Sequence, residues 1–426
     1  MSRSTENIRE KLVPDGSAST EPSEAVVSAV EGEITEHEQT IHRVPGKSGL
    51  VREHDSGTEK VKKPTGGKSL ALVTDEKLLF VMVGRGQSEV RQIAYTNVRS
   101  VDSADGLLRS KLTVKVWGDG EYRFKVGDGD KLAAAVRYIE EASACWQRVV
   151  SAVEDATGQT KEMGECLEDG NLTGAQEARE AAAGKLERAY RYLDDAEIDP
   201  PQALIEKVET AAVEHNRTEI RNRLTRAETL ITEGKHQADS RSYTGAYQRY
   251  MDARDHLESA REIARDSDIP EPPEIEAKLQ RLESRLRHLE VRPMALAKQA
   301  SERAEGTDKL DVEVEAWQEA FEHCRDALTA GWGTELEFEG DTWDIRLKTE
   351  LIVEKLIEKR KALADEYERE GDELASRDPT RAIDNYETAI EQLEQAHQFA
   401  SEFRAGDSDD LDDELDRIAA KRLDLR

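Results

Sequence analysis

The chain of 426 residues is poor in aromatic residues, in cysteine and in long apolar segments. Aromatic side chains make up 5% of the residues, and the three cysteines, Cys145, Cys166 and Cys324, lie far apart in the sequence. This usage argues against a disulfide framework and is typical of a reducing compartment. No apolar segment approaches the roughly 18 residues that a membrane-spanning helix needs, and none follows the N-terminus as in a secretory signal. We therefore expect a cytoplasmic protein.

Positive charge is also scarce. The chain has 61 Lys and Arg against 91 Asp and Glu, which gives a net charge of −30. A general nucleic-acid binder is excluded, because phosphate contacts need a cationic surface. Two interpretations stay open: a solvation adaptation, which resembles the haloarchaeal type of acidic protein, and a specific acidic docking surface. The dispersal of the acidic residues through nearly every predicted helix favours the first.

Motifs for catalysis, metals and nucleotides are missing. Two GKS strings end at Ser48 and Ser69, but the glycine that a P-loop needs five residues earlier is replaced by Ile41 and Lys62. The histidines lack ligand spacing and there is no CxxC pair. The acidic run Asp407–Asp413 lacks the glycine and the carboxylate spacing of an EF-hand. We therefore predict no enzyme activity, no cofactor and no metal.

What the sequence does have is a long stretch, Lys68 to Val126, in which apolar residues alternate with polar ones. Alternation with a period of two, interrupted by turn residues such as Gly118-Asp119-Gly120, predicts an antiparallel barrel or sandwich. Pro45 to Lys63 reads as a long loop or a weak hairpin. A short helix is expected at Glu24–Val30. The predicted strands are Gln39–Val44, Ser69–Thr74, Leu78–Val83, Glu89–Ala94, Val98–Asp102, Leu112–Trp117 and Tyr122–Val126.

An amphipathic helix follows the last strand. It begins at Lys131 after the capping residue Asp130 and carries apolar residues at helical spacing. The predicted buried positions are Leu132, Ala135, Val136, Ile139, Ala142 and Trp146.

The segments LALVTDEKLLFV, IAYTNVRSVDSADGLLRSKLTVKV and YRFKV, with the helix after them, resemble prokaryotic PH-like (GRAM-related) domains. The resemblance covers roughly Glu31 to Trp146. It implies an antiparallel β-barrel capped by a C-terminal helix. It also implies a binding role, in a superfamily that is used for lipids, peptides and proteins alike.

From about Ala142 onward the apolar period is helical, with helices of about 12 to 25 residues. Ile275–Leu289 and Leu351–Leu374 suit long exposed or coiled-coil helices. Breaks are predicted at Thr157-Gly158, Asp169–Gly174, Asp199–Pro201, Gly234, Asp268–Pro273, Pro293, Gly306, Gly331–Gly340, Asp378-Pro379 and Gly406.

One helical pattern occurs twice. Ala246, Tyr250 and Ala253 have the same spacing as Ala382, Tyr386 and Ala389, which resembles the second helix of a tetratricopeptide (TPR) repeat. Gln176–Leu186 and Ala316–Leu328 are weaker copies. The alternative is a plain helical bundle that uses Ala and Tyr as core residues.

The predicted fold class is therefore α+β: a PH-like barrel capped by a helix, then an extended all-α region of TPR-like hairpins or a bundle. The predicted domains are a disordered leader (1–23), the PH-like domain (24–150), the TPR-like or coiled-coil region (151–405), and an acidic linker with a C-terminal helix (406–426).

The barrel stretch carries an unusual local charge. Lys60 to Val126 holds 13 Lys and Arg against seven Asp and Glu. These cations could bind an anionic membrane surface, dock on acidic helices of this chain or of a second copy, or form a solvated face. The candidate binding residues are Lys60, Lys62, Lys63 and Lys68, and a second cluster of Arg109, Lys111 and Lys115.

A second candidate patch is aromatic. Trp332, Phe338 and Trp343 lie in a glycine-rich segment that interrupts the helices and could contact a partner. The alternative is a loop held by aromatic residues against the helical core.

Together these patterns favour a non-enzymatic adaptor or scaffold that binds a protein partner through its helices and is positioned by its PH-like domain. The alternatives are a peripheral membrane protein that binds anionic lipid, and a self-assembling structural protein that forms homo-oligomers.

Overall fold

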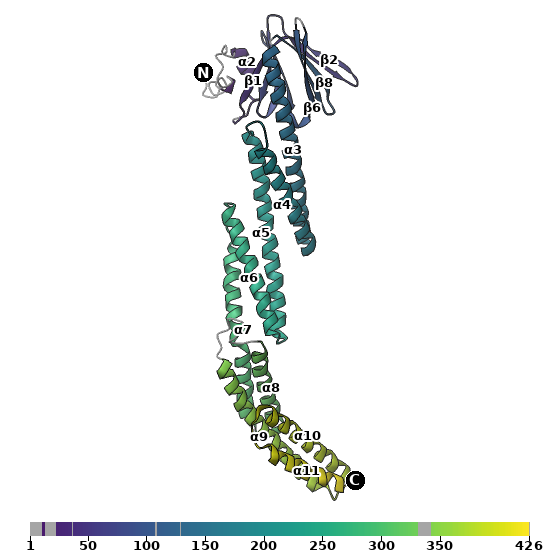
Figure 1. Cartoon of the computed structure of the whole chain (residues 1–426), viewed down its shortest axis with the longest axis vertical. Helices are drawn as coiled ribbons and strands as arrows, with labels where there is room; N and C mark the ends of the chain where they lie inside the picture. The colour runs from purple at the N-terminus through teal and green to yellow at the C-terminus, as the bar shows by residue number, and fades with distance from the viewer. Residues whose placement is uncertain are drawn as a thin grey trace. The chain divides into compact units, whose positions relative to one another are not determined.

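The computed structural model describes residues 11–12, 23–35, 37–106, 109–127, 129–330 and 342–425. After a short helix at Glu24–Val30, the strands come first and the remaining helices follow (Figure 1), so the predicted α+β class is confirmed. The chain divides into two compact units, each described by itself below. The first comprises residues 1–222 and 263–269, and the second comprises residues 223–262 and 270–426.

The first unit begins with one antiparallel sheet in the order β5-β4-β3-β1-β8-β7-β6, with β2 paired to β1. No pairing joins β5 to β6, so the sheet is an open barrel within the described residues. A 3₁₀ turn, η1 (Tyr95–Asn97), separates those two strands. The strands are β1 (Thr40–His54), β2 (Gly57–Val61), β3 (Lys68–Thr74), β4 (Lys77–Gly84), β5 (Gln87–Ala94), β6 (Val98–Gly106), β7 (Arg109–Val116) and β8 (Gly120–Val126).

Strand β1 is longer than predicted. It continues past Pro45 to His54 and forms a hairpin with β2. The sequence predicted either a long loop or a weak hairpin for Pro45–Lys63; the loop is wrong and the hairpin is confirmed. At Gly46 the strand pairs with Ser69 of β3 on one side and Val126 of β8 on the other. A Cβ at Gly46 would lie 2.2 Å from Cζ of Phe124, so only glycine fits where β1 joins the two halves of the sheet.

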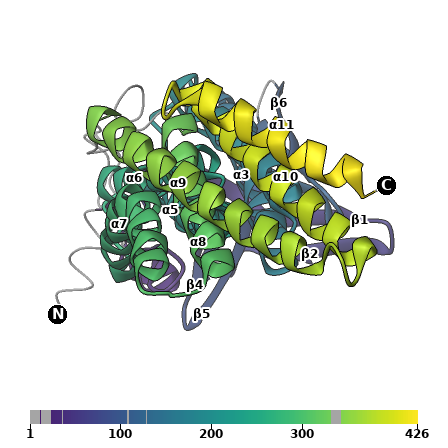
Figure 2. The same ribbon diagram turned by 90° about the horizontal axis from the view of Figure 1, so that it is seen from below.

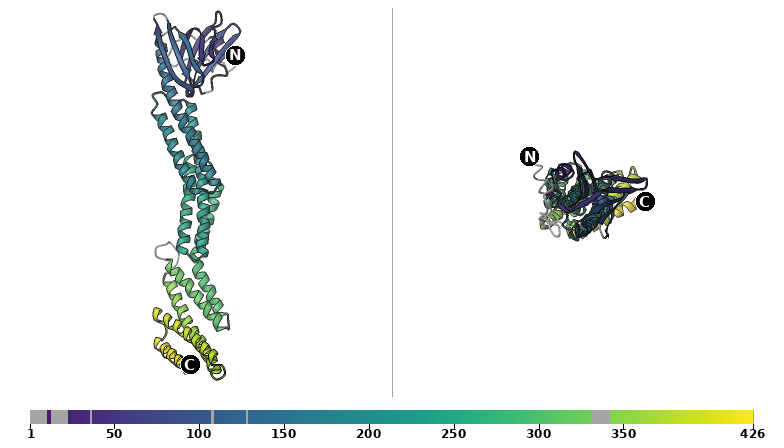
Figure 3. Two further views of the ribbon diagram at one scale, coloured as in Figure 1. Left: turned by 90° about the vertical axis from the view of Figure 1, so that its right-hand side faces the viewer. Right: turned by 90° about the horizontal axis from the view of Figure 1, so that it is seen from above.

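Helix α3 (Gly129–Glu168) lies against the inner face of the curved sheet (Figures 1 and 3). Of the predicted helix positions, all but Trp146 are buried, and Trp146 is partly buried against the same core. Helix α2 (Glu24–Val30), which was predicted, covers the outer face of β3 and β4 through Val26, Val27 and Val30. Strands β3 and β4 are therefore buried on both faces, whereas the outer face of β2, β1, β8 and β7 has no such cover within the described residues.

Hydrogen bonds from α3, from Gln39 before β1 and from η1 hold the turn between β3 and β4. The indole Nε1 of Trp146 donates to the carbonyl of Asp75 (3.1 Å), and the backbone N–H of Gln39 donates to the Asp75 carboxylate (2.8 Å). The hydroxyl of Tyr95, which is fully buried, donates to the carbonyl of Thr74 (2.5 Å). Asp75 is 9% exposed, and burial raises its pKa to about 6.

The rest of the first unit is helical. Helix α4 (Leu172–Asp194), whose N-terminus is capped by Asn171, packs on the second half of α3. The first turns of α5 (Gln202–Asp239) share one apolar cluster with both helices. The predicted break at Thr157-Gly158 is wrong. Gly158 lies on the exposed side of α3, where a single glycine costs only about 1 kcal/mol and the flanking turns hold the helix. The buried residues shared by these helices include Val149, Val153, Ala189, Leu193, Leu204 and Val208.

The second unit takes in the end of α5 and most of α6, and the helices that follow. Figure 2 shows α10 and α11 side by side, and the two helices are in contact. The helices are α6 (Tyr243–Asp266), α7 (Pro273–Glu305), α8 (Leu310–Thr329), α9 (Thr342–Leu374), α10 (Pro379–Phe403) and α11 (Ser408–Asp424). Four of the chain's helices, α3, α5, α7 and α9, exceed the predicted 12 to 25 residues.

Helices α6 and α10 are equivalent over most of their buried faces. Each buried residue of α6 from Ala246 to Ala264 has a buried counterpart 136 positions later in α10. The C-terminal ends of the two helices match as well, since Asp268 and Arg404 both have φ of 52°. After α6 the N–H of Ile269 donates to the carbonyl of Ala264, and after α10 the N–H of Ala405 donates to that of Ala400. The buried pairs are Ala246 with Ala382, Tyr250 with Tyr386, Ala253 with Ala389, Leu257 with Leu393, Ala260 with Ala396, and Ala264 with Ala400.

Each tyrosine packs on a glycine of the preceding helix. A Cβ at Gly234 would lie 2.6 Å from Cε1 of Tyr250, and a Cβ at Gly371 would lie 2.6 Å from Cε1 of Tyr386. The predicted break at Gly234 is therefore wrong: this glycine lets two helices approach and does not end one. The break at Pro293 is also wrong. Proline removes the N–H that would reach the carbonyl of Leu289 and crowds that carbonyl, yet α7 continues through it.

We predict that Gly371→Ala destabilises the second unit by about 1–3 kcal/mol, because the new methyl group would overlap the Tyr386 ring. Gly158→Ala is the control. Its Cβ meets nothing within 4 Å, so the ordinary helix preference should stabilise the first unit by about 0.5–1 kcal/mol. Hydrogen exchange of peptides from α9–α10 and from α3 measures both effects. Equal effects of the same sign would refute the packing argument.

We predict that Asp75→Asn makes the first unit more stable above pH 6. In the unfolded chain Asp75 ionises near its ordinary pKa of 3.8, but in the fold it ionises near 6. The wild type therefore loses about 1–3 kcal/mol as the pH rises from about 4 to 6. Asparagine can still accept the Gln39 N–H and removes that loss. Urea denaturation at pH 4, 5, 6 and 8 measures the free energy of unfolding of both proteins. Their difference should grow as the pH rises, and a difference that does not change with pH would disprove the raised pKa of Asp75.

Candidate functional site

The outer face of β2, β1, β8 and β7 carries several of the cations that the sequence pointed to, among them Lys60, Lys111 and Lys115. Successive strand residues face opposite sides of a sheet. Leu112, Val114 and Phe124 point into the core, so Lys111, Lys115 and Lys125 point outward. This face is therefore polar and open to solvent.

Two of these lysines face each other directly. Lys111 of β7 is paired in register with Lys125 of β8. Strand β1 lies between β8 and β2, and it has a bulge between Gly46 and Leu50 opposite Lys125. Within this bulge Gly49 lies against Lys62, which follows the last residue of β2: a Cβ at Gly49 would be 2.9 Å from the Cα of Lys62. Lys62, Lys125 and Lys111 thus follow one another across four strands, and we call them the lysine row.

Nothing within the described residues neutralises the lysine row, since none of its three members forms an ion pair there. Like charges placed directly opposite on a sheet destabilise it by about 0.2–1 kcal/mol. An anion bound between Lys111 and Lys125 would remove that repulsion. The row is therefore a candidate anion site.

More lysines lie next to the row. Lys60, two residues before Lys62, pairs with Val51 of β1, and Lys63 follows Lys62. Lys68 begins β3 beside the Gly46–Ser69 pair, where Lys47 continues β1. The side chain of Lys47 lies over Gly127, since a Cβ there would be 2.9 Å from its Cε. All four belong to the same end of the sheet as the lysine row.

The next two outward positions along β7 and β8 are different, because carboxylates lie beside their cations. Arg123 of β8 forms ion pairs with Glu53 and Glu121. Lys115 is paired in register with Glu121, so a carboxylate lies opposite it. The structure therefore separates Lys115 from Lys111, although both were predicted in one cluster.

Of the remaining predicted cations, Arg109 begins β7 opposite Gly106, and its side chain lies outside the described residues. Lys125 and Lys47 were missed. The Gly118-Asp119-Gly120 turn gave the signal for Lys125, because a hairpin that pairs Val116 with Gly120 also pairs Lys111 with Lys125.

The aromatic candidates are only partly described. Trp332 and Phe338 lie outside the described residues. Trp343, in the first turn of α9, is 65% exposed. Leu347 and Leu351 are also exposed, and their spacing of four residues places all three on one face of α9.

No group of three or more His, Cys, Asp and Glu side chains suited to a metal ion occurs in the part of the chain that the structure describes. Among the same residues, no helix combines the length and the apolar character needed to cross a membrane.

Comparison with known proteins gives one match. Residues 21–141 match the family model described as Bacterial PH domain. The N-terminal domain is a PH-like domain. The matched range runs from α2 through the whole sheet to the first turns of α3. No curated protein and no solved structure gives a significant match. The PH-like domain is accordingly a module of a kind that interacts with proteins or lipids, and the lysine row lies on its open face.

We predict opposite effects of the same charge reversal at two positions of the β7–β8 hairpin of the PH-like domain. Lys125→Glu places a carboxylate opposite Lys111 and should stabilise the domain by about 0.2–1 kcal/mol, whereas Lys115→Glu places one opposite Glu121 and should destabilise it by a similar amount. Thermal unfolding of the two variants at low salt, compared with wild type, measures the difference. The same sign of change in both would contradict the register argument.

Proposed function

We propose that the protein is a non-enzymatic adaptor. Its PH-like domain contacts an acidic protein surface through the lysine row, and its helical region binds a second protein. The observation that supports this most strongly is the direct apposition of Lys111 and Lys125, with Lys62 in the same row, on a solvent-facing sheet without a described carboxylate partner. A chain with a net charge of −30 has ample carboxylates to cancel such charges.

The helical region supports the second contact. The equivalence of α6 with α10, and the glycine under each tyrosine, favour TPR-like helix pairs over an irregular bundle. Such pairs present grooves that take up helices or extended peptides. The exposed face of Trp343, Leu347 and Leu351 on α9 offers apolar anchors of the kind that dominate binding energy.

The lysine row also supports a second function, recruitment to an anionic membrane. Each lysine near such a surface contributes about 1 kcal/mol at moderate salt. A third function is self-assembly, in which the row meets the acidic helices of a second copy. In all three functions the lysine row meets an anionic surface. The experiment must therefore show whether that surface belongs to another protein, a membrane or a second copy of this chain.

The test uses the full chain and a variant with Lys62, Lys111 and Lys125 all changed to Glu. We predict that wild type does not co-sediment with phosphatidylserine vesicles at low salt and stays monomeric in light scattering over a wide concentration range. We also predict that a photo-crosslinking group at Thr113, one outward position from Lys111 on β7, crosslinks the full chain to an acidic protein of its own lysate, and that the variant carrying the same group loses this crosslink.

If wild type sediments with the vesicles at low salt and the variant does not, the adaptor proposal is wrong and membrane recruitment takes its place. A dimer that dissociates in the variant would replace it by self-assembly. A variant with Lys161, Lys298 and Lys355 of the helices changed to Glu is the control for net charge, since these exposed lysines lie outside the PH-like domain. If this control loses the crosslink as well, the row has no specific role.

A further inference from the structure

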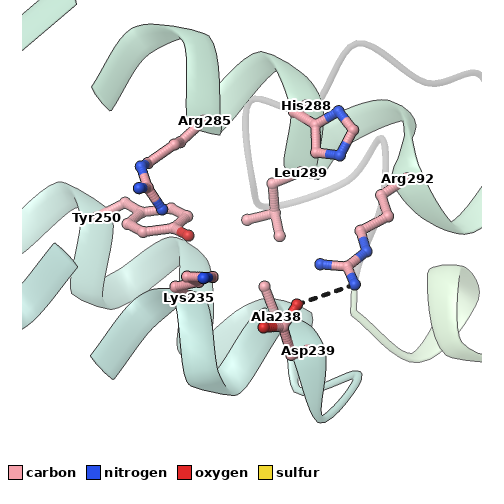
Figure 4. Close-up of a pocket in the computed structure, with 8 residues that line it drawn as sticks. All are labelled: Lys235, Ala238, Asp239, Tyr250, Arg285, His288, Leu289 and Arg292. Carbon is pink, nitrogen blue, oxygen red and sulfur yellow. Dashed lines mark hydrogen bonds and ion pairs between the residues drawn. The ribbon is translucent and has the colours of Figure 1, made fainter. Parts of the chain in front are cut away.

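A second cationic site lies in the helical region, far along the chain from the lysine row. A pocket of about 330 Å³ opens between α5, α6 and α7 in the second unit. Figure 4 shows side chains from these helices converging on it. Its lining residues are Lys235, Ala238, Asp239, Tyr250, Arg285, His288, Leu289 and Arg292.

The floor of the pocket is apolar and closely packed. Ala238 and Leu289 are buried, and the ring of Tyr250 is held against α5 because Gly234 has no side chain. In Figure 4 the hydroxyl of Tyr250 is turned toward the middle of the group. The floor therefore suits an apolar body, with a hydroxyl to orient a polar one.

The rim is cationic. Arg292 forms an ion pair with Asp239 at 3.0 Å, and Asp239 is the one carboxylate that lines the pocket. Lys235, Arg285 and His288 form no ion pair within the described residues. Three permanent cations and one carboxylate leave the pocket with two positive charges, in a chain that is strongly acidic elsewhere.

The equivalent position in the second copy of the repeat shows what is missing. Helices α9, α10 and α11 correspond to α5, α6 and α7, and Lys421 of α11 lies 136 residues after Arg285. Lys421 bonds to Asp372, the residue that follows Gly371, at 2.7 Å. The residue that follows Gly234 is Lys235. The cation at this position of the third helix thus pairs with a carboxylate in one copy, where it is Lys421, and shares a pocket with an ammonium in the other, where it is Arg285.

The second copy is neutralised further by its own residues. Glu368 of α9 accepts bonds from Lys421 (2.8 Å) and from Arg417 of α11, and the hydroxyl of Tyr386 donates to Asp372 (2.7 Å). In the first copy Tyr250 has the same packing as Tyr386, but the carboxylate at the Asp372 position is replaced by Lys235. An anion from outside the chain would restore the same set of bonds.

We propose that the pocket binds a small phosphate monoester. A phosphoryl group carries close to two negative charges at pH 7 and three acceptor oxygens, which matches the two surplus charges and the convergent donors of Lys235, Arg285 and Tyr250. Arginine recognises phosphate in a bidentate manner. The buried Leu289 and the Tyr250 ring receive the organic part, and the volume is that of a small-molecule site.

The test is calorimetric titration of the full chain with phenyl phosphate. Wild type should bind one equivalent, more tightly than it binds benzoate, which has one charge, or inorganic phosphate, which has no apolar body. Lys235→Asp reproduces the Asp372 arrangement, so it should keep the fold and weaken phenyl phosphate binding by about tenfold or more. Lys207→Asp, an equal charge change at an exposed position of the same helix, should leave binding unchanged.

Equal binding of phenyl phosphate by wild type and Lys235→Asp would overturn the proposal, as would absence of binding by wild type. Tighter binding of a phosphoserine peptide than of phenyl phosphate would also overturn it, because the site would then recognise a phosphorylated protein instead of a small molecule. Circular dichroism of Lys235→Asp confirms that the loss does not come from unfolding.

Discussion

Burial of the inner face of the sheet under the first turns of α3 is the interaction on which the rest of the PH-like domain depends. The helix fills the open barrel, and Trp146 fixes it to the turn at Asp75. Because the inner face is filled and α2 covers β3 and β4, the sheet has one broad face left for solvent or a partner. That remaining face is where Lys111 meets Lys125. The core thus decides which side of the domain is available for binding.

The two candidate sites follow one electrostatic rule. In a protein with many more carboxylates than cations, most cations find a partner, as Arg123 does on the sheet and Lys421 does in α11. Where Lys111 faces Lys125, or Lys235 lies near Arg285, the fold holds like charges together. Such positions cost stability in the free protein, and a bound anion lowers that cost. Two comparisons show the alternative arrangement: on the same sheet Lys115 lies opposite Glu121, and in the second copy of the repeat Lys421 pairs with Asp372.

Much of the fold could be predicted from the sequence, because period-two and period-3.6 patterns report which face of each element is buried. Helix α2, the strands after Lys68 and the first turns of α3 were recognised in this way. The failures have local causes. Gly234 packs under a tyrosine, Pro293 is tolerated inside a long helix, and β1 passes through Pro45 to join two halves of the sheet. The lysine row was harder to predict than the fold. Composition locates a basic stretch, but only the strand register shows that Lys125, and not Lys115, lies beside Lys111. The pocket could not be predicted, because Lys235 and Arg285 are fifty residues apart and meet only through helix packing.

The central claim is that the cations left without carboxylates are anion-binding positions. The most direct measurement is the midpoint of thermal unfolding in pyrophosphate and in sodium chloride at equal ionic strength, for wild type and for a chain carrying both Lys125→Glu and Lys235→Asp. The account predicts that pyrophosphate raises the midpoint of wild type above its value in chloride, since a ligand that binds the folded state stabilises it, and that the doubly changed chain loses most of this increment. An equal increment in both proteins would contradict the claim, because the anion would then act on the whole surface and not at these two sites.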